Sequence, residues 1–385
     1  MNATKDQKVG KLKIFSFFSG CGFLDLGFEN SGYEIETVNE YSASFMNAYK
    51  YSREKMHHPS PKQGYYNCDV NDFLEEKKSN ELAKLMTDAR KDDSLVGFIG
   101  GPPCPDFSIA GKQKGRNGDN GKLSLSYIEL IIKQKPDFFL FENVKGLWST
   151  AKHRAYYDEL KQMLQDAGYK MIDRMTNALE FGVAQDRDRI LLFGIRKDIA
   201  EKYKYDLSVF PWNKYMKYTM DKIKSIPWPD VDPFEENSER DIPKGIPKEL
   251  TVEYWFRHNK VEKHPDKDRF FVPRAGLKKM LVIDEGDSNK KSYKRLHRWR
   301  YSPTAAYGNN EVHLHPYMAR RLSVAECLAI QSLPKEFSLP TEMSLSDCFK
   351  TIGNGVPYLL SYGIARTIKD FLESNNGQIN SEYIG

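Results

Sequence analysis

The 385-residue chain is long enough to bury one large core and a smaller module, and its composition, with 40% hydrophobic and 29% charged residues, is that of a globular protein. No run of about 18 apolar residues occurs and the first residues are polar, which excludes a membrane-spanning helix and a signal peptide and favours a cytoplasmic location. The five cysteines are scattered, without Cys-x-x-Cys pairs or histidines at ligand spacing, which argues against disulfides and against a metal site.

The net charge of +5 is unevenly distributed along the chain. Residues 197–318 contain 24 Lys and Arg against 19 Asp and Glu, so this part holds the whole positive excess. Within it, residues 290–300 carry six basic residues and no acid: Lys290, Lys291, Lys294, Arg295, Arg298 and Arg300. A polyanionic partner and a merely solvated basic face explain such a run equally well.

The first 196 residues alternate between short apolar runs and helical patterns. The runs at 13–18, 35–39, 95–99 and 137–141 predict buried strands, and the apolar spacing over 123–134 predicts a helix. This alternation is typical of an α/β fold, in which helices cover a parallel sheet. Two later runs, 169–175 and 190–195, predict an antiparallel pair at one edge of the sheet, because no long helix separates them.

The pattern changes near residue 198, where prolines and charges become dense and helical periodicity fades. Such a stretch indicates a separate loop-rich module. Helical patterns return over 323–331 and from Pro357 to Phe371. We therefore expect a catalytic and cofactor-binding domain over 1–197, a loop-rich domain over 198–318, a bridging segment over 319–349, and a return to the first domain over 350–385.

A glycine-containing turn, 18–22, follows the first predicted strand and opens a helix. Its glycines allow backbone N–H groups to approach a ligand. Glu40 ends the second strand, where it can accept hydrogen bonds from ribose hydroxyls, and Asp69 is placed at the end of a third strand. A plain tight turn is the alternative, but the spacing to Glu40 favours a nucleoside-containing cofactor. The third glycine of the dinucleotide fingerprint is missing, which favours adenosylmethionine over a nicotinamide.

A thiol and a carboxyl group each follow a predicted strand. Cys104 lies in the stiff loop Gly101-Pro-Pro-Cys104-Pro, and Glu142 ends the next apolar run. Thiolates are strong nucleophiles, and a carboxyl group buried against apolar residues can stay protonated and donate a hydrogen bond. Addition of the thiolate to C6 of cytosine, with N3 bonded to that acid, would make C5 carbanion-like. Methylation of an exocyclic amine would need no thiol, so the cysteine discriminates between these chemistries.

Two arginines, Arg187 and Arg189, lie two residues apart at the start of a later strand. They project to the same side and can hold a phosphate or an anionic intermediate. The alternative, favoured when this segment is taken alone, is a surface ion-pair ladder with Asp186 and Asp188.

Taken together, the motifs resemble the cytosine-C5 DNA methyltransferases. The ordered set is Phe-Ser-Gly-Cys-Gly (18–22), Gly-Pro-Pro-Cys (101–104), Glu-Asn-Val (142–144), Gln-x-Arg-x-Arg (185–189), Arg-Arg-Leu-Ser-x-x-Glu (320–326) and Gly-Asn-Gly-Val (353–356). The resemblance covers nearly the whole chain except about 198–300, where that family places its variable target-recognition region. The fold it implies is the Rossmann-like sheet of class I adenosylmethionine-dependent methyltransferases.

The resemblance implies roles for individual residues. In catalysis, Cys104 is expected to be the nucleophile, Glu142 and Asn143 to form the Glu-Asn pair, and Arg187 and Arg189 to hold the flipped cytosine. The residues expected around S-adenosyl-L-methionine are Phe18, Ser19, Gly20, Cys21, Gly22, Glu40, Tyr41, Asp69, Pro102, Leu123 and Asn354. The residues expected to contact DNA are Ser108, Lys112, Lys114, Arg116, Arg295, Arg298, Arg300 and Thr304, the last in the stretch that closes the recognition region.

The chain departs from the family pattern at three positions, where Pro105, Phe23 and Ala184 replace a glutamine, a glycine and a proline. None removes a catalytic group, but Pro105 deprives the catalytic loop of a side-chain amide near the DNA. The implied function is methylation of double-stranded DNA by a monomer, with the target cytosine flipped out, in a restriction-modification system that includes a paired endonuclease. Two rivals are a tRNA methyltransferase, whose Cys-Phe-Thr segment is absent from the recognition region, and a DNA-binding regulator with a dead catalytic domain.

Overall fold

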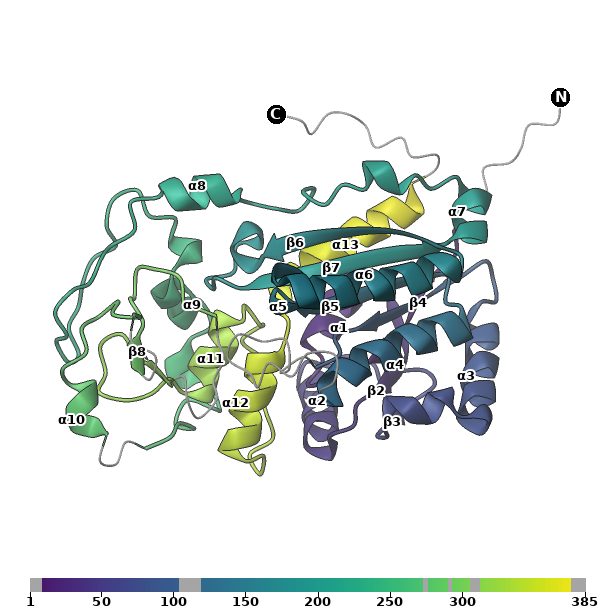
Figure 1. The fold of residues 1–385 in the computed structure, drawn as a ribbon. Helices are drawn as coiled ribbons and strands as arrows, with labels where there is room; N and C mark the ends of the chain where they lie inside the picture. Colours follow the sequence, from purple (N-terminus) through teal and green to yellow (C-terminus); the bar gives the residue numbers. More distant parts are fainter. Residues whose placement is uncertain (1–8, 104–118, 273–275, 290–292, 305–311, 375–385) are drawn as a thin grey trace.

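The computed structural model describes residues 9–103, 119–272, 276–289, 293–304 and 312–374 of the chain. Figure 1 shows two parts side by side: a sheet sandwiched between helices, and a lobe dominated by loops and short helices. Helices α11 (Val324–Ile330) and α12 (Leu345–Asn354) lie between them.

The sheet has seven strands in the order β3-β2-β1-β4-β5-β7-β6. Strand β7 is antiparallel to both of its neighbours, and the other pairings are parallel. The predicted strands and the antiparallel pair are therefore confirmed. The strand bounds are β1 Leu12–Phe17, β2 Glu34–Asn39, β3 Tyr65–Tyr66, β4 Leu95–Gly100, β5 Phe138–Val144, β6 Tyr169–Asn177 and β7 Asp188–Arg196.

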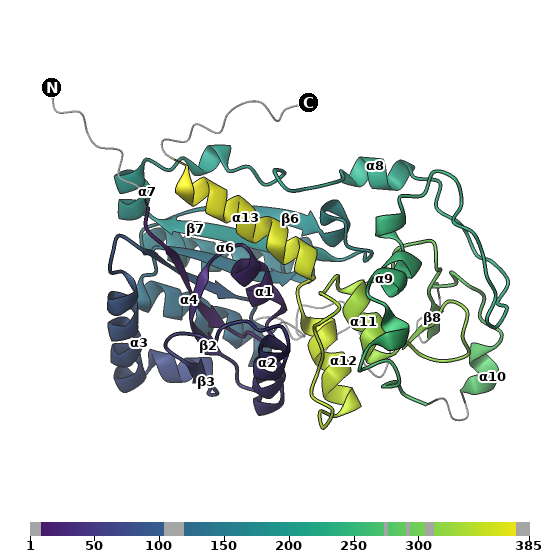
Figure 2. The ribbon, with the colours of Figure 1, turned by 180° about the vertical axis from the view of Figure 1, so that it is seen from behind.

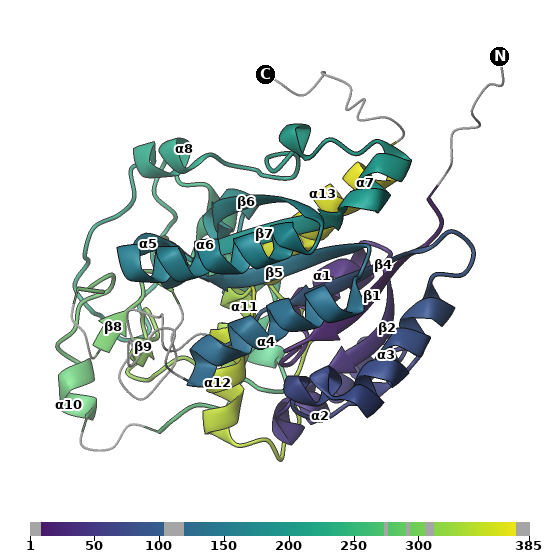
Figure 3. The same ribbon diagram turned by 45° about the vertical axis from the view of Figure 1, so that its right-hand side comes forward.

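Side chains alternate between two cores, as expected for strands whose period is two. On β5, Phe138 and Leu140 enter one core, whereas Phe139 and Phe141 enter the other. Helices α1 (Phe23–Asn30) and α13 (Tyr358–Glu373) pack against each other on the first face, as Figure 2 shows. The second face is covered by α3 (Glu76–Ala89), α4 (Asp119–Gln134) and α6 (Ala151–Asp166), which lie in front in Figure 3. The expected α/β sheet with helices on both faces is therefore confirmed.

Two glycines permit this tight packing. A Cβ atom at Gly97 would lie 2.2 Å from the Phe138 ring, and one at Gly194 would lie 2.2 Å from the Phe139 ring on the opposite face. The neighbouring strand therefore fills the space that each missing side chain leaves.

The segment that follows β7 stays with the sheet before it enters the loop-rich lobe. Helix α7 (Lys197–Tyr203) and the residues up to Trp212 contribute buried side chains to the core that α1 and α13 cover. The chain then runs over α13 towards α8 (Met220–Ser225), as the teal segment at the top of Figure 1 shows. The expected domain boundary at 198 therefore cuts through this packing, which continues for about 15 residues beyond it.

The loop-rich lobe contains α9 (Val252–His258), α10 (Leu277–Met280) and a small parallel pair, β8 (Tyr293–Arg295) with β9 (Val312–Leu314). Its attachment to the sheet part is apolar, because α9 shares one core with α1, α2 (Ala43–Lys55), α11 and α12. The remaining short elements in the described part of the chain are α5 (Gly146–Ser149) and five 3-10 turns, of which Val70–Leu74 and Ala178–Phe181 adjoin the sheet.

Candidate active site

The ends of β1, β2, β4 and β5 bring the predicted motifs to one edge of the sheet. In register, Phe17 pairs with Gly100, and Gly100 pairs with Phe141. Strands β1 and β4 therefore end level with Phe141 of β5. The next residues are the turn 18–22 after β1, the loop from Gly101 after β4, and Glu142 on β5. Open α/β sheets bind their ligands at this carboxyl edge.

The turn after β1 has an unusual backbone. Phe18, Gly20 and Gly22 all adopt positive φ angles, of 54°, 55° and 79°. Gly22 must be glycine for a second reason, because a Cβ atom there would lie 2.4 Å from the Tyr49 ring. Among the described residues, a Cβ atom at Gly20 would meet nothing closer than Thr351 Oγ1 at 3.8 Å, so they leave this side of the turn open.

Glu40 is tied to the same turn. Its carboxylate accepts hydrogen bonds from the backbone N–H groups of Gly20 and Ser42, both at 2.8 Å. Burial raises the pKa of this carboxyl group, although the backbone hydrogen bonds oppose the shift. A carboxylate has about four acceptor sites, more than the backbone groups of Gly20, Tyr41 and Ser42 occupy, so one remains for a ligand hydroxyl. Beside it, Tyr41 is 75% exposed and offers a free aromatic face.

The other residues expected around the cofactor lie close to this edge. The Phe18 ring meets the Tyr127 ring of α4 edge to face at 5.9 Å, and Leu123 on the same helix is partly buried in the same core. The Cys21 thiol is buried and accepts a hydrogen bond from Thr351 Oγ1 at 2.9 Å, which joins the turn to α12.

Asp69 and Asn354 occupy the ends of other elements. Asp69 caps the 3-10 turn Val70–Leu74 by accepting the N–H of Asn71, so it does not end a strand as expected. Asn354 is the last residue of α12 and is exposed. The open face of Gly20, the Glu40 carboxylate and the exposed Tyr41 ring together fit a ligand that carries a ribose and an aromatic base.

Glu142 is buried and paired. Its Oε1 lies 2.7 Å from Arg189 Nε, and both side chains are less than 10% exposed. Loss of hydration raises the pKa of Glu142, and the charges of Arg189 and Arg187 lower it by a smaller amount. Gly101 lies against this carboxylate, since a Cβ atom there would be 2.5 Å from Oε2. The carboxyl group therefore favours its neutral form more than an exposed glutamate does.

The alternative of a surface ion-pair ladder for residues 186–189 is wrong. Arg187 is fully buried and donates to the Gly353 carbonyl of α12 at 2.8 Å, whereas Arg189 pairs with Glu142. Asp188 instead accepts hydrogen bonds from Lys145 and Asn177. Arg187 thus reaches α12, and Arg189 reaches Glu142 near the carboxyl end of β5.

Cys104, together with Ser108, Lys112, Lys114 and Arg116, lies outside the described residues. The residues that lead to Cys104 are described: the Pro102 carbonyl accepts a hydrogen bond from Asn143 Nδ2 at 3.4 Å. Because Asn143 follows Glu142, this contact fixes the start of the cysteine loop beside the buried carboxyl group.

The expectation that Arg295 and Arg298 contact DNA is wrong. The Arg295 guanidinium is fully buried and donates to the carbonyls of Met280, Ile283, His315 and Met318. Arg298 is 2% exposed and forms two hydrogen bonds with the buried Glu285. Both side chains use their donors to hold the loop-rich lobe together. Lys290 and Lys291 lie outside the described residues, and Arg300 is partly exposed.

Thr304 connects the lobe to the arginine motif. Its hydroxyl donates to the Asp186 carbonyl at 2.5 Å, and Ser302 pairs with Gln185 in a short parallel bridge. Thr351 and Arg53 belong to none of the predicted sites, although both contact the turn 18–22. No local pattern marks them, because each contact joins segments at least 31 residues apart.

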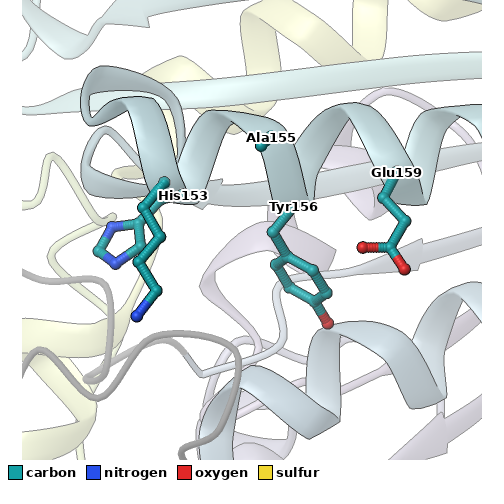
Figure 4. Close-up of a pocket in the computed structure, with 5 residues that line it drawn as sticks. His153, Ala155, Tyr156 and Glu159 are labelled. Carbon is teal, nitrogen blue, oxygen red and sulfur yellow. The ribbon is translucent and has the colours of Figure 1, made fainter.

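A hollow of about 210 Å³ lies along α6, lined by Lys152, His153, Ala155, Tyr156 and Glu159 (Figure 4). Of the predicted site residues that the structure describes, none lines it. Among the described residues, no group of His, Cys, Asp and Glu is arranged to hold a metal ion. No helix in the same part of the chain has the length and apolar character needed to cross a membrane.

Comparisons with known proteins agree with the geometry. Residues 12–370 match the family model of the C-5 cytosine-specific DNA methylases. The Type II methyltransferase M.NmeDI of Neisseria meningitidis serogroup C is 54% identical over 369 residues, which cover 96% of this chain and 86% of the relative. The Type II methyltransferase M.FnuDI of Fusobacterium nucleatum is 33% identical over 367 residues, covering 94% and 95%.

Two solved structures share the fold. One, described as a DNA modification methyltransferase encoded within a prophage (E. coli), has a TM-score of 0.64 at 21% identity and covers 95% of this chain and 100% of that one. Spodoptera frugiperda DNMT2 has a TM-score of 0.56 at 16% identity and covers 94% and 100%. With the buried Glu142–Arg189 pair beside the cysteine loop, the family match over 12–370 leads to one conclusion: the chain belongs to the C-5 cytosine-specific DNA methylase family and is a DNA cytosine-5 methyltransferase.

Proposed function

We propose that the enzyme transfers a methyl group from S-adenosyl-L-methionine to C5 of a cytosine flipped out of duplex DNA, through a transient bond between Cys104 and C6. The observation that carries this proposal is the buried Glu142, whose pKa is raised and whose neighbour Asn143 holds the start of the cysteine loop.

The steps follow from the chemistry of these side chains. The Cys104 thiolate adds to C6 while neutral Glu142 donates its proton to N3, so the ring electrons collect at C5. When bound, S-adenosyl-L-methionine supplies an electrophilic methyl group on a sulfonium sulfur. C5 bonds to that methyl carbon as the bond from the carbon to sulfur breaks. Transfer of the C5 proton to a water molecule then restores the C5–C6 double bond and expels the Cys104 thiolate from C6, and N3 returns its proton to Glu142. Arg189 holds the carboxyl group in place throughout.

Binding of the donor is supported by the open side of the turn 18–22. Glu40 would accept hydrogen bonds from the ribose hydroxyls, and the exposed Tyr41 ring would stack on the base. Phe18, packed edge to face against Tyr127, would close the opposite side of the base.

The substrate follows from geometry and from the relatives. A base inside a duplex cannot reach a residue at a sheet edge, so the cytosine must rotate out, at a cost of a few kcal/mol. Because the relatives above are Type II methyltransferases, we further propose that the enzyme is a cytoplasmic monomer that protects DNA from a paired endonuclease.

The test is transfer of labelled methyl groups to unmethylated duplex DNA, with tRNA assayed in parallel. The wild type should label DNA and not tRNA, and Cys104→Ser should label neither. A duplex in which 5-fluorocytosine replaces the target should become covalently trapped by the wild type when the methyl donor is present. Equal activity of the serine variant, or no trapping, contradicts the covalent step, and labelling of tRNA alone contradicts the DNA substrate.

A further inference from the structure

We propose that Arg53 is a positioning residue for the methyl donor, because its guanidinium holds the turn 18–22 in the shape that receives the ligand. The inference rests on the proposed function, since it takes this turn to be part of the S-adenosyl-L-methionine site. Arg53 belongs to none of the motifs that identify the family.

Arg53 reaches the turn from α2. Its Nη2 donates to the Gly22 carbonyl at 2.6 Å, and Nη1 donates to the Cys21 carbonyl at 3.5 Å. Its Nε donates to Glu29 on α1 at 2.7 Å. The side chain is 1% exposed, so these contacts form away from water. One guanidinium thus ties the turn to two helices.

The surroundings favour a guanidinium over any other cation. The Tyr49 ring stacks under Arg53 at 4.2 Å, and the Glu29 carboxylate, itself nearly buried, neutralises the charge. A planar fork with five N–H donors serves two carbonyls and one carboxylate together, whereas an ammonium group on a lysine stem does not.

The turn needs such a support because its backbone conformation is unfavourable. Phe18 is a bulky residue at φ 54°, a region in which a non-glycine residue persists only where its surroundings hold it. Tyr49 and Arg53 form the wall behind Gly22, where a Cβ atom would lie 2.4 Å from the ring and 2.6 Å from Nη2. On the other side, the Thr351 hydroxyl holds the Cys21 sulfur. Removal of Arg53 takes one donor from each of the Cys21 and Gly22 carbonyls. The Gly22 carbonyl keeps the N–H of Leu26, but the link from the turn to α2 is lost, and the turn can then relax on this side.

A relaxed turn misplaces the N–H of Gly20, which orients the Glu40 carboxylate. The loss should therefore appear as weaker donor binding rather than as slower chemistry. Isothermal titration of the full chain with S-adenosyl-L-methionine measures this directly. We expect Arg53→Met to weaken binding by roughly tenfold to a hundredfold, the range for loss of hydrogen bonds to a buried charge. At saturating donor, kcat should stay within about twofold while KM for the donor rises in parallel.

The matched control is Arg295→Met, which also removes a fully buried arginine that donates to backbone carbonyls, but in the loop-rich lobe. It should lower the melting temperature and leave the dissociation constant of the donor unchanged. Amide hydrogen exchange at residues 19–22 should accelerate in Arg53→Met and not in the control.

The outcomes separate this inference from the proposed function. If the wild type does not bind S-adenosyl-L-methionine, the proposed cofactor is wrong. If the wild type binds it and a folded Arg53→Met binds it equally well, only the role of Arg53 is wrong. Should Arg53→Met not fold, Arg53→Lys decides: a wild-type dissociation constant for the donor overturns the inference, and a dissociation constant raised above the wild-type value supports it.

Discussion

Arg189 Nε lies 2.7 Å from Glu142 Oε1, across the antiparallel pair of β5 and β7. Glu142 stands opposite Leu191, so Arg189 is its diagonal neighbour two residues along β7. Burial raises the pKa of the carboxyl group more strongly than the nearby cation lowers it. The pair therefore orients Glu142 without forcing it to ionise, which suits a group that must give a proton to N3 and recover it.

Glu142→Gln should lower kcat by roughly 10²- to 10⁴-fold, because the amide keeps the shape of the side chain but cannot transfer a proton. The pH profile gives a second check. Wild-type kcat should fall as the pH rises past the pKa of Glu142, since the neutral acid is lost, and the variant should lack this alkaline limb. DNA affinity, measured by fluorescence anisotropy, should be nearly unchanged. An alkaline limb that persists in Glu142→Gln would assign it to another group.

Arg189→Met should move the alkaline limb to higher pH. The positive charge of Arg189 lowers the pKa of Glu142, so its removal raises that pKa further and keeps the acid neutral over a wider range. The rate at the optimum should nevertheless fall, because Glu142 loses the group that orients it. Profiles of kcat against pH for the two proteins test the shift, and a limb that moves to lower pH contradicts it.

Gly22→Ala should destabilise the protein far more than Gly168→Ala. Both glycines have positive φ, of 79° and 89°, so both substitutions strain the backbone by about 1 kcal/mol. Only Gly22 is crowded, by the Tyr49 ring and Arg53, whereas a Cβ atom at Gly168 has nothing within 4 Å. We expect the overpacking at Gly22 to add about 1–3 kcal/mol. Urea denaturation gives the free energy of unfolding of both variants. Equal losses of stability would mean that Tyr49 and Arg53 move aside at little cost.

The two arginines at 298 and 300 should behave in opposite ways. Arg298→Met removes the nearest cation from the buried Glu285, leaving Arg240 Nε at 3.8 Å, and should reduce the free energy of unfolding by roughly 3–5 kcal/mol. Arg300→Met should barely affect the free energy of unfolding. If Arg300 contacts a phosphate, the slope of the logarithm of the DNA-binding constant against the logarithm of salt concentration should become shallower by about one. Denaturation and DNA titrations at several salt concentrations test both, and an unchanged slope removes Arg300 from the interface.

The longer strands of the sheet could be predicted from the sequence because a local apolar run marks each of them. The apolar runs are buried on both faces, and the residues after β1, β2, β4 and β5 reach one edge wherever parallel strands are aligned. Glu40 and Glu142 lie where this logic places them. The cofactor turn and the arginine motif could likewise be located, because short spacings define them.

Contacts between distant segments could not be predicted in this way. The run 290–300 is basic in composition, yet Arg295 is enclosed by carbonyls from residues 280, 283, 315 and 318, and the sequence gives no sign of that enclosure. Similarly, the aspartates beside Arg187 suggested local ion pairs, whereas its partner is the carbonyl of Gly353, 166 residues away. A buried arginine and a DNA-binding arginine are indistinguishable until the fold shows what surrounds each.

Asp25→Asn should stabilise the protein at neutral pH and have no such effect in acid. Asp25 is fully buried in the first turn of α1, accepts a hydrogen bond from Ser16 at 2.9 Å, and has its pKa raised by burial from 3.8 to about 6. Because the folded state binds this proton more tightly than the unfolded state, the neutral carboxyl contributes stability below pH 3.8, and that contribution is lost as the pH rises to about 6. Two pKa units correspond to about 3 kcal/mol, so the asparagine, which never ionises, should gain up to about 3 kcal/mol at pH 7.5 relative to pH 3.5.

Asp88→Asn is the control for this experiment, since Asp88 is exposed and Lys91 lowers its pKa. Free energies of unfolding at the two pH values decide the matter: a gain of equal size at both would show that Asp25 does not titrate over this range.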